Sequence, residues 1–180
     1  MPDARSVPAA MRRACKHKVV TEESRPVGAR IADAVDLLRG SGVTVETSAQ
    51  AAATIYTVKR PAYHLEIVVD SVRFLGLSFD LLGCDGSVIV GYEVDTDLYR
   101  ISLPRHRWFA TEVETDIVAL VEALIQGKVL VDTGPPRASM VVPTGDGLML
   151  VQRRRFLTTS NPYGGDACSA LAAGFRPLPP

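Results

Sequence analysis

The chain has 180 residues, of which 47% are hydrophobic and 22% charged, and this is enough apolar content for one domain with a buried core. Twenty acidic and twenty basic residues give a formal net charge of zero, so no overall field attracts nucleic acid or anionic lipid. The three cysteines are far apart and lack Cys-x-x-Cys spacing, which argues against a disulfide framework or a zinc site. The N-terminus lacks the apolar run of a signal peptide, and no apolar stretch is long enough to span a bilayer. We therefore expect a cytoplasmic protein that needs neither a metal nor a cofactor.

The N-terminal region divides into a leader and a first helix. Residues 1–25 combine prolines and a basic run with few apolar residues, so we predict a flexible leader. Residues 26–39 have the four-residue apolar period of a helix, with Ser24 as a candidate cap and Gly40 as a stop signal.

From Val43 onward the apolar period changes to two, which is typical of strands. Residues 43–47 form a short predicted strand, whereas residues 50–58 fit either a helix or a strand, because alanines precede a β-branched run. Alternation and turn residues then predict a meander of four further strands at residues 63–69, 75–81, 88–94 and 99–103.

The clearest single element is an amphipathic helix over residues 111–127. Thr111 and Glu114 have the spacing of a capping box, in which the two side chains satisfy free backbone N–H groups reciprocally. Apolar residues recur at three- and four-residue steps, and Gly127 stands where a left-handed C-terminal residue is expected.

A second strand region follows this helix. We predict a short strand at residues 129–131 and a hairpin at residues 140–151, with its turn at Pro143–Gly147. A weakly ordered tail is predicted from residue 158. The pattern predicts a single α+β domain over residues 26–157, with a mostly antiparallel meander sheet of about six to eight strands and two helices packed on one face.

Two groups of residues are candidates for a small-molecule or metal site. His64, Glu66 and Asp70 lie on one side of a predicted strand, but a solvent-facing strand shows the same pattern and no third metal ligand is identifiable. A concavity between the curved sheet and the central helix would be lined by four polar candidates, His64, Tyr92, Tyr99 and Arg100.

Two arginine clusters are candidates for contacts with an anion or a partner. Arg105, Arg107 and Trp108 precede the central helix, where guanidiniums and an indole could hold a phosphate, a carboxylate or a base. We favour the alternative that Trp108 and Phe109 are an apolar lead-in that packs the start of the helix against the sheet. Arg153 and Arg155 share one face at the end of a strand, where charges also protect a sheet edge from aggregation.

No arrangement of residues in the sequence favours catalysis. The leading hypothesis is a non-enzymatic protein that binds another protein, as an accessory subunit, a chaperone or an inhibitor of the immunity type. Its motivation is that Phe74, Leu82 and Ile89 place apolar side chains on the second face of the sheet, which a partner or a homodimer copy would cover. The alternatives are a small-molecule-binding protein or enzyme, and a nucleic-acid-binding protein that uses the arginine clusters; no membrane association is expected.

Overall fold

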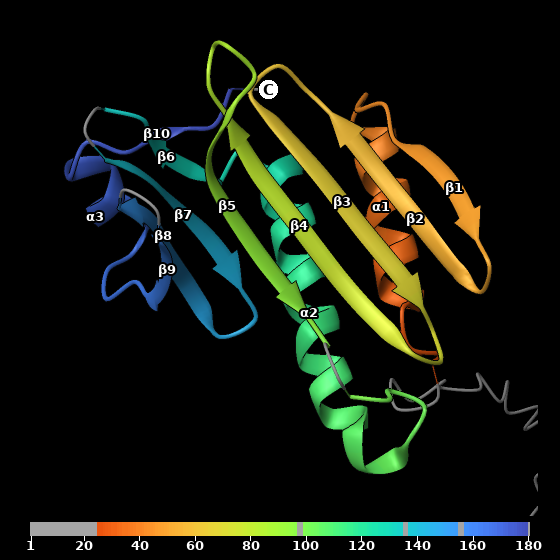
Figure 1. Cartoon of the computed structure of the whole chain (residues 1–180). Coiled ribbons are helices and arrows are strands. Elements are labelled where there is room, and N and C mark those ends of the chain that lie inside the picture. Colours follow the sequence, from red (N-terminus) through yellow and green to blue (C-terminus); the bar gives the residue numbers. More distant parts are fainter. Residues whose placement is uncertain (1–24, 97–98, 135–136, 155–156, 180) are drawn as a thin grey trace, which may run out of the picture.

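The computed structural model describes residues 25–96, 99–134, 137–154 and 157–179. It shows a single α+β domain with two five-stranded antiparallel sheets and three α-helices, and thereby confirms the predicted class (Figure 1). The strands are divided between two sheets, however, where the sequence predicted one meander. The predicted leader lies outside the described residues, apart from Arg25.

The first sheet, sheet A, is an uninterrupted meander in which each strand pairs with the next along the chain. The ambiguous residues 50–58 contain no helix: the first strand ends at Gln50, the chain turns at Ala51 in the left-handed region, and residues 53–58 belong to the second strand of the hairpin. The strands of sheet A are β1 (Glu46–Gln50), β2 (Ala53–Lys59), β3 (Tyr63–Asp70), β4 (Phe74–Leu82) and β5 (Val88–Asp95).

The second sheet, sheet B, has the order β10-β6-β7-β8-β9. The segment after residue 157, where we predicted weak order, supplies β9, the short helix α3 (Ala167–Ala172) and β10. This segment is joined to the rest of the domain because Leu178 is buried and its N–H donates to the Val129 carbonyl at 2.8 Å. The strands of sheet B are β6 (Leu130–Asp132), β7 (Ala138–Thr144), β8 (Gly147–Arg154), β9 (Leu157–Pro162) and β10 (Arg176–Pro177).

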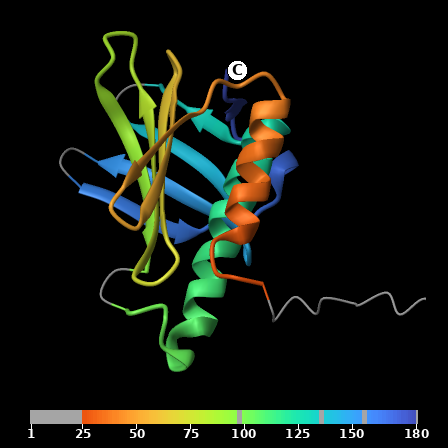
Figure 2. The ribbon, with the colours of Figure 1, turned by 90° about the vertical axis from the view of Figure 1, so that its right-hand side faces the viewer.

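The two long helices, α1 (Ala29–Gly40) and α2 (Arg107–Ile125), cover the same face of sheet A (Figure 2). The α2 helix also packs on β7, so one helix serves both sheets. The core between these layers contains fully buried side chains from every layer, among them Ile31, Phe79, Ile117, Leu120 and Met140. Within the residues that the structure describes, no helix combines the length and the apolar character needed to cross a membrane.

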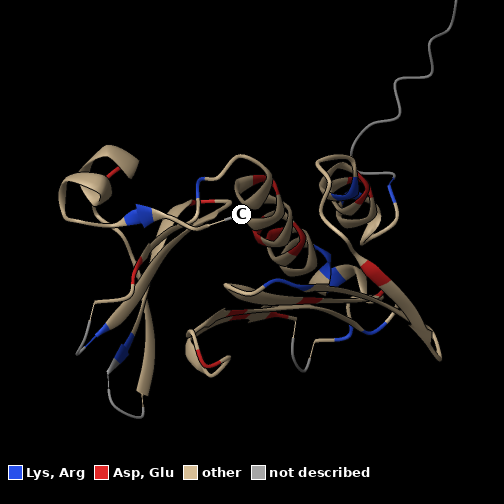
Figure 3. Cartoon of the chain, turned by 90° about the horizontal axis from the view of Figure 1, so that it is seen from above, with Lys and Arg blue, Asp and Glu red and all other residues tan. Residues whose placement is uncertain are grey.

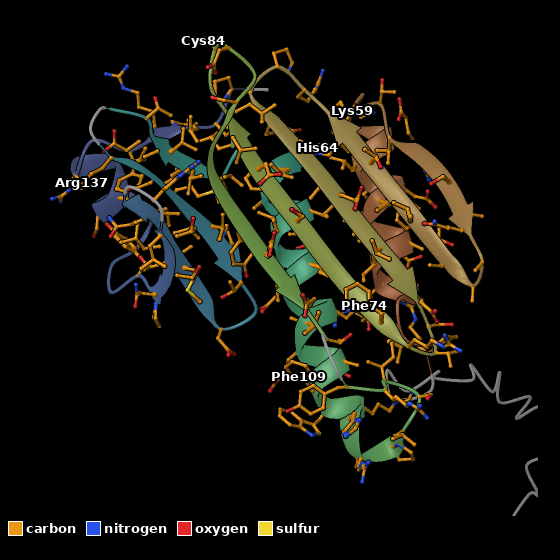
Figure 4. The ribbon with its side chains drawn as sticks, viewed as in Figure 1. Lys59, His64, Phe74, Cys84, Phe109 and Arg137 are labelled. Carbon is orange, nitrogen blue, oxygen red and sulfur yellow. The ribbon has the colours of Figure 1, made fainter. Side chains whose placement is uncertain are left out.

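Within the part of the chain that the structure describes, no helix lies on the other face of sheet A (Figures 1 and 2). Polar residues are interspersed with apolar ones on it, and Lys59, His64 and Asp80 stand opposite one another on three neighbouring strands (Figure 4). Phe74, which we predicted to need a partner, is half-buried because its ring lies over Gly76, where a Cβ atom would meet the ring at 2.5 Å. Two other apolar residues predicted to need cover are also half-buried, Leu82 and Ile89. The open sheet face therefore shields part of its own apolar surface.

The start of α2 differs from the prediction. The helix begins at Arg107 rather than Thr111, and Thr111 donates its hydroxyl to the Arg107 carbonyl at 2.9 Å inside the helix. The strand predicted at residues 99–103 is instead a pair of turns that lead into the 3-10 helix η2 (Pro104–His106). Pro104 lacks a backbone N–H, so the chain bends into a helix where a strand would have needed a donor. At the other end, Gly127 adopts φ 64° as expected.

Candidate interaction site at the start of the central helix

Four rings pack together where α2 begins. Tyr99 contacts His106 with ring centroids 5.0 Å apart and Phe109 at the same distance, and Trp108 contacts Phe109 at 5.7 Å. His106 Nδ1 also lies 3.1 Å from the Arg100 carbonyl oxygen, which ties the preceding turn to this cluster. The segment projects beyond the end of both sheets, with Phe109 at its base (Figures 1 and 4). We call the rings and their three neighbouring arginines the aromatic tip: Tyr99, Arg100, Arg105, His106, Arg107, Trp108 and Phe109.

The aromatic tip is exposed although it is rich in large rings. The side chain of Trp108 is 63% exposed and that of Tyr99 49% exposed, and all three arginines are exposed. The interpretation of Trp108 as a buried lead-in to the helix is therefore wrong; only Phe109 is half-buried in that role. The reason is the earlier start of the helix, which turns Trp108 away from the apolar stripe that faces the sheets.

The four residues predicted to line a pocket between the sheet and α2 do not meet. Tyr92 is buried in the core, and His64 lies on the opposite, open face of sheet A (Figure 4). Tyr99 and Arg100 both belong to the aromatic tip. The structure thus places Tyr99 and Arg100 beside the other candidates Arg105, Arg107 and Trp108, whereas Tyr92 and His64 lie elsewhere. A ligand-binding role for any of these residues stays a prediction.

A cavity of about 250 Å³ lies on one flank of α2, against the start of α1. Glu114, only 5% exposed, is one of its lining residues and accepts the N–H groups of Gly28 at 3.0 Å and Arg30 at 3.1 Å. The carboxylate predicted to cap its own helix therefore caps α1, where backbone N–H groups have no acceptor within the helix. Arg25, Arg30 and Arg107 are also among the residues that line this cavity.

An acidic cavity of about 370 Å³ lies beside α2 as well, between the helix, the end of β5 and the β7–β8 turn. Asp116 accepts the Gly145 N–H at 2.7 Å, yet burial raises the pKa of its carboxyl above the ordinary value, and the nearby charge of Asp146 raises it further. Burial and the Asp116 charge together raise the pKa of Tyr92 to about 12, so this phenol stays neutral. The carboxylates that line this cavity are Asp95, Glu112, Asp116 and Asp146.

The other arginine cluster lies on sheet B. Arg153 donates from its guanidinium to the Val88 carbonyl on β5, so it links the two sheets at the place where β8 approaches β5. Arg155 lies outside the described residues. The aromatic tip and the two cavities beside α2 thus bring exposed rings and charged side chains together around the first half of this helix.

Sequence reasoning missed Arg25, Arg30 and the true role of Glu114. A capping box is a local signal, but Glu114 is 86 positions from the N–H group that it receives from Gly28. No local pattern reports such a pairing. A buried acid inside an apolar helix stripe was the available signal, because a carboxylate in that place requires buried donors.

The chain matches no protein-family model, no curated protein and no solved structure. Within the described residues, no group of three or more His, Cys, Asp or Glu is placed to hold a metal ion. Basic and acidic segments are interspersed over the helices and sheets (Figure 3). What the site can do therefore rests on its own rings, charges and cavities.

Proposed function

We propose that this protein is a non-enzymatic accessory, chaperone-like or inhibitor-type protein that binds another protein through the aromatic tip. The observation that supports it is the exposed Trp108 at the start of a helix that extends beyond both sheets. Exposing an indole and a phenol to water forgoes the free energy of burying them, so their exposure suggests a surface that is covered in a complex.

The composition of the aromatic tip is that of an interface centre. Tryptophan, tyrosine and arginine are the residues whose truncation most often weakens protein complexes. The rings also support one another, because Phe109 contacts both Tyr99 and Trp108. A surface that is already ordered loses less conformational entropy when it binds.

Charge indicates the chemistry of the partner. The aromatic tip carries three exposed arginines and no acidic residue among its members. It therefore suits an apolar pocket with an acidic rim. A two-fold dimer through the tip would place the arginines of two copies against each other, so we favour a different protein over a second copy of this chain.

The test is capture from an extract of the native host, followed by reconstitution with the purified partner. Trp108→Ala is expected to reduce affinity for that partner at least tenfold, which corresponds to about 1.4 kcal/mol or more. Leu157→Ala is the matched control, because Leu157 is a large apolar residue that is 65% exposed on β9, away from the tip. Equal affinities for the two variants would refute the proposal.

The same rings and arginines support a second candidate, binding of single-stranded nucleic acid by stacking of bases on Trp108 and Tyr99. The two candidates differ in their response to salt. Contacts to phosphates make the affinity for nucleic acid fall steeply as salt is raised, whereas a complex centred on buried rings changes far less. If no binding of a single-stranded oligonucleotide is detected at low salt, this candidate is refuted.

A further inference from the structure

We infer that a cavity between the two sheets is a binding site for an α-amino acid with an apolar side chain, in its zwitterionic form. The cavity has a volume of about 450 Å³, within the range of about 300–1,000 Å³ that is typical of small-molecule pockets. Sheet A contributes Leu81 and Leu82 at the end of β4, and sheet B contributes residues of β6 and β10. We call this cavity the inter-sheet pocket.

The lining of the inter-sheet pocket is mainly apolar. Leu81, Val131 and Leu178 are buried, and Pro177 and Pro179 add apolar surface on the exposed side. The two prolines lack the backbone N–H groups with which a further strand would pair at the β10 edge of sheet B. The pocket therefore suits a small molecule with an apolar part rather than an extended peptide that adds a strand.

Backbone hydrogen bonds fix the pocket on both sides. On sheet A, the Leu82 N–H donates to the Ala62 carbonyl at 2.8 Å. On sheet B, the Leu178 N–H donates to the Val129 carbonyl at the same distance. A pocket that is already formed loses less conformational entropy when a ligand enters it.

Two lining residues are charged, Asp132 and Arg176, and their charges have opposite sign. Arg176 stands opposite Val131 in the β10–β6 pairing, so its side chain lies on the same face of the sheet as this buried residue. The Asp132 carboxylate accepts the Gly134 N–H at 3.0 Å, which holds it beside another residue of the lining. The formal charge of the lining is therefore zero, with a donor group and an acceptor group at separate places.

The two charged groups do not neutralise each other. Within the residues that the structure describes, Asp132 and Arg176 form no ion pair, and the Arg176 guanidinium makes no hydrogen bond. Asp132 uses Oδ1 for the Gly134 N–H, and a carboxylate can accept further donors at its other oxygen. The Arg176 fork matches a ligand carboxylate, and the Asp132 carboxylate matches a ligand ammonium. An acid or an amine alone would leave one of the two residues facing a like charge.

A single ligand class satisfies all of these groups. The carboxylate and the ammonium of an α-amino acid match Arg176 and Asp132, and an apolar side chain is taken out of water by the leucines, the valine and the prolines. The inter-sheet pocket lies at the opposite end of the domain from the aromatic tip (Figure 1). The inference therefore does not depend on the proposed function.

The test is an NMR titration of the full chain with L-phenylalanine, in which backbone amide signals report both the affinity and the place of binding. The signals of Thr133, Gly134 and Leu178, which line the pocket, should shift. Arg176→Gln and Asp132→Asn are each expected to weaken binding about tenfold or more, since each removes a charge-assisted hydrogen bond to the ligand.

Matched controls remove one exposed charge of each sign far from the pocket. Arg73→Gln lies in the β3–β4 turn, at the opposite end of β4 from Leu82, and Glu112→Gln lies near the start of α2. Both should leave the affinity for L-phenylalanine unchanged within about twofold, because salt screens charges at such separations. Trp108→Ala should also leave it unchanged, so failure of the aromatic tip and failure of the inter-sheet pocket are distinguishable.

Analogues that carry only one of the two charges separate a binding role from a structural one. Hydrocinnamate lacks the ammonium and phenethylamine lacks the carboxylate, so each should bind the parent chain about tenfold or more weakly than L-phenylalanine. Asp132→Asn should strengthen the binding of hydrocinnamate, and Arg176→Gln that of phenethylamine, because each removes a like charge. Variants that only damaged the pocket would instead weaken the binding of all three ligands, and this result would contradict the inference.

Glycine tests the apolar part of the pocket. It keeps both charges without a side chain and should bind about tenfold or more weakly than L-phenylalanine, because no apolar surface is buried. The inference is overturned if L-phenylalanine does not bind, if either single-charge analogue or glycine binds as tightly, or if the Arg176 and Asp132 variants bind like the Arg73 and Glu112 controls.

Discussion

The two ends of α2 differ in what they present to water. From Val113 onward the apolar face of the helix is buried, with Ile117 and Leu120 fully enclosed by the core that α2 shares with both sheets. In the first turn, by contrast, the largest side chain of the helix is 63% exposed. One continuous helix therefore serves as a structural axis at its C-terminal end and as a presented surface at its N-terminal end.

This difference shows that burial along a helix follows packing partners rather than the hydrophobicity of single residues. Trp108 is apolar and exposed because the first turn of α2 lies beyond the ends of both sheets. Glu114 is charged and buried because the start of α1 supplies two N–H groups for its carboxylate. From the sequence of α2 alone, Trp108 would be expected to be buried and Glu114 to be exposed.

The largest expected effect on stability is at the buried end. Ile117→Ala removes a fully enclosed side chain between the layers and is expected to lower the free energy of unfolding by about 2–5 kcal/mol, since both apolar burial and packing are lost. Urea denaturation followed by circular dichroism measures it. A loss below about 0.5 kcal/mol, the level of an ordinary surface substitution, would contradict the packing of α2 described above.

Glu114→Ala should come next. It leaves the N–H groups of Gly28 and Arg30 without their acceptor in a buried setting, at an expected cost of about 2–4 kcal/mol in the free energy of unfolding. The matched control is Glu112→Ala, which removes an exposed carboxylate from the same helix and should change stability by less than about 0.5 kcal/mol. Hydrogen exchange at the first turn of α1 should speed up in the Glu114 variant alone; equal exchange in both variants would argue against a capping role.

Asp116→Asn tests the pH dependence of the region between the two ends. The pKa of the Asp116 carboxyl is raised in the folded state, so folding favours the protonated form, and stability is lost as pH rises from below 3.8 through the folded pKa. The asparagine variant does not ionise and still offers an oxygen to the Gly145 N–H. It should therefore be more stable than the parent at pH 7, by an amount that shrinks toward pH 3. Urea midpoints at the two pH values provide the comparison, and a variant that is less stable at pH 7 would reverse the sign.

The smallest expected effect on stability is from the largest ring. Trp108→Ala should change the free energy of unfolding by less than about 1 kcal/mol, because most of the indole surface already contacts water. The same urea denaturation followed by circular dichroism measures it, because this substitution removes the single tryptophan of the chain and with it a fluorescence signal. A loss comparable to that of Ile117→Ala would place the indole in the core.

The sequence was sufficient for the elements whose signals are local. Two-residue periodicity and turn residues located β3, β4, β5 and the β7–β8 hairpin, and Gly127 ended α2 as expected. The division into two sheets could not be derived, because it depends on α2 standing between the meanders. The candidate site was recovered in part: Arg105, Arg107 and Trp108 were identified by residue type, whereas their exposure and the distant Arg25 and Arg30 depend on how α1 packs against α2.

The most direct test of the proposed function uses Trp108 as its own probe, because it is the only tryptophan in the chain. Its emission and its quenching by acrylamide are measured in the free protein and after addition of the partner captured from the host. We predict solvated emission and ready quenching in the free protein, then a blue shift and protection from acrylamide in the complex. A complex that forms with the emission and quenching of Trp108 unchanged would show that the partner binds elsewhere, and would contradict the role assigned to the aromatic tip.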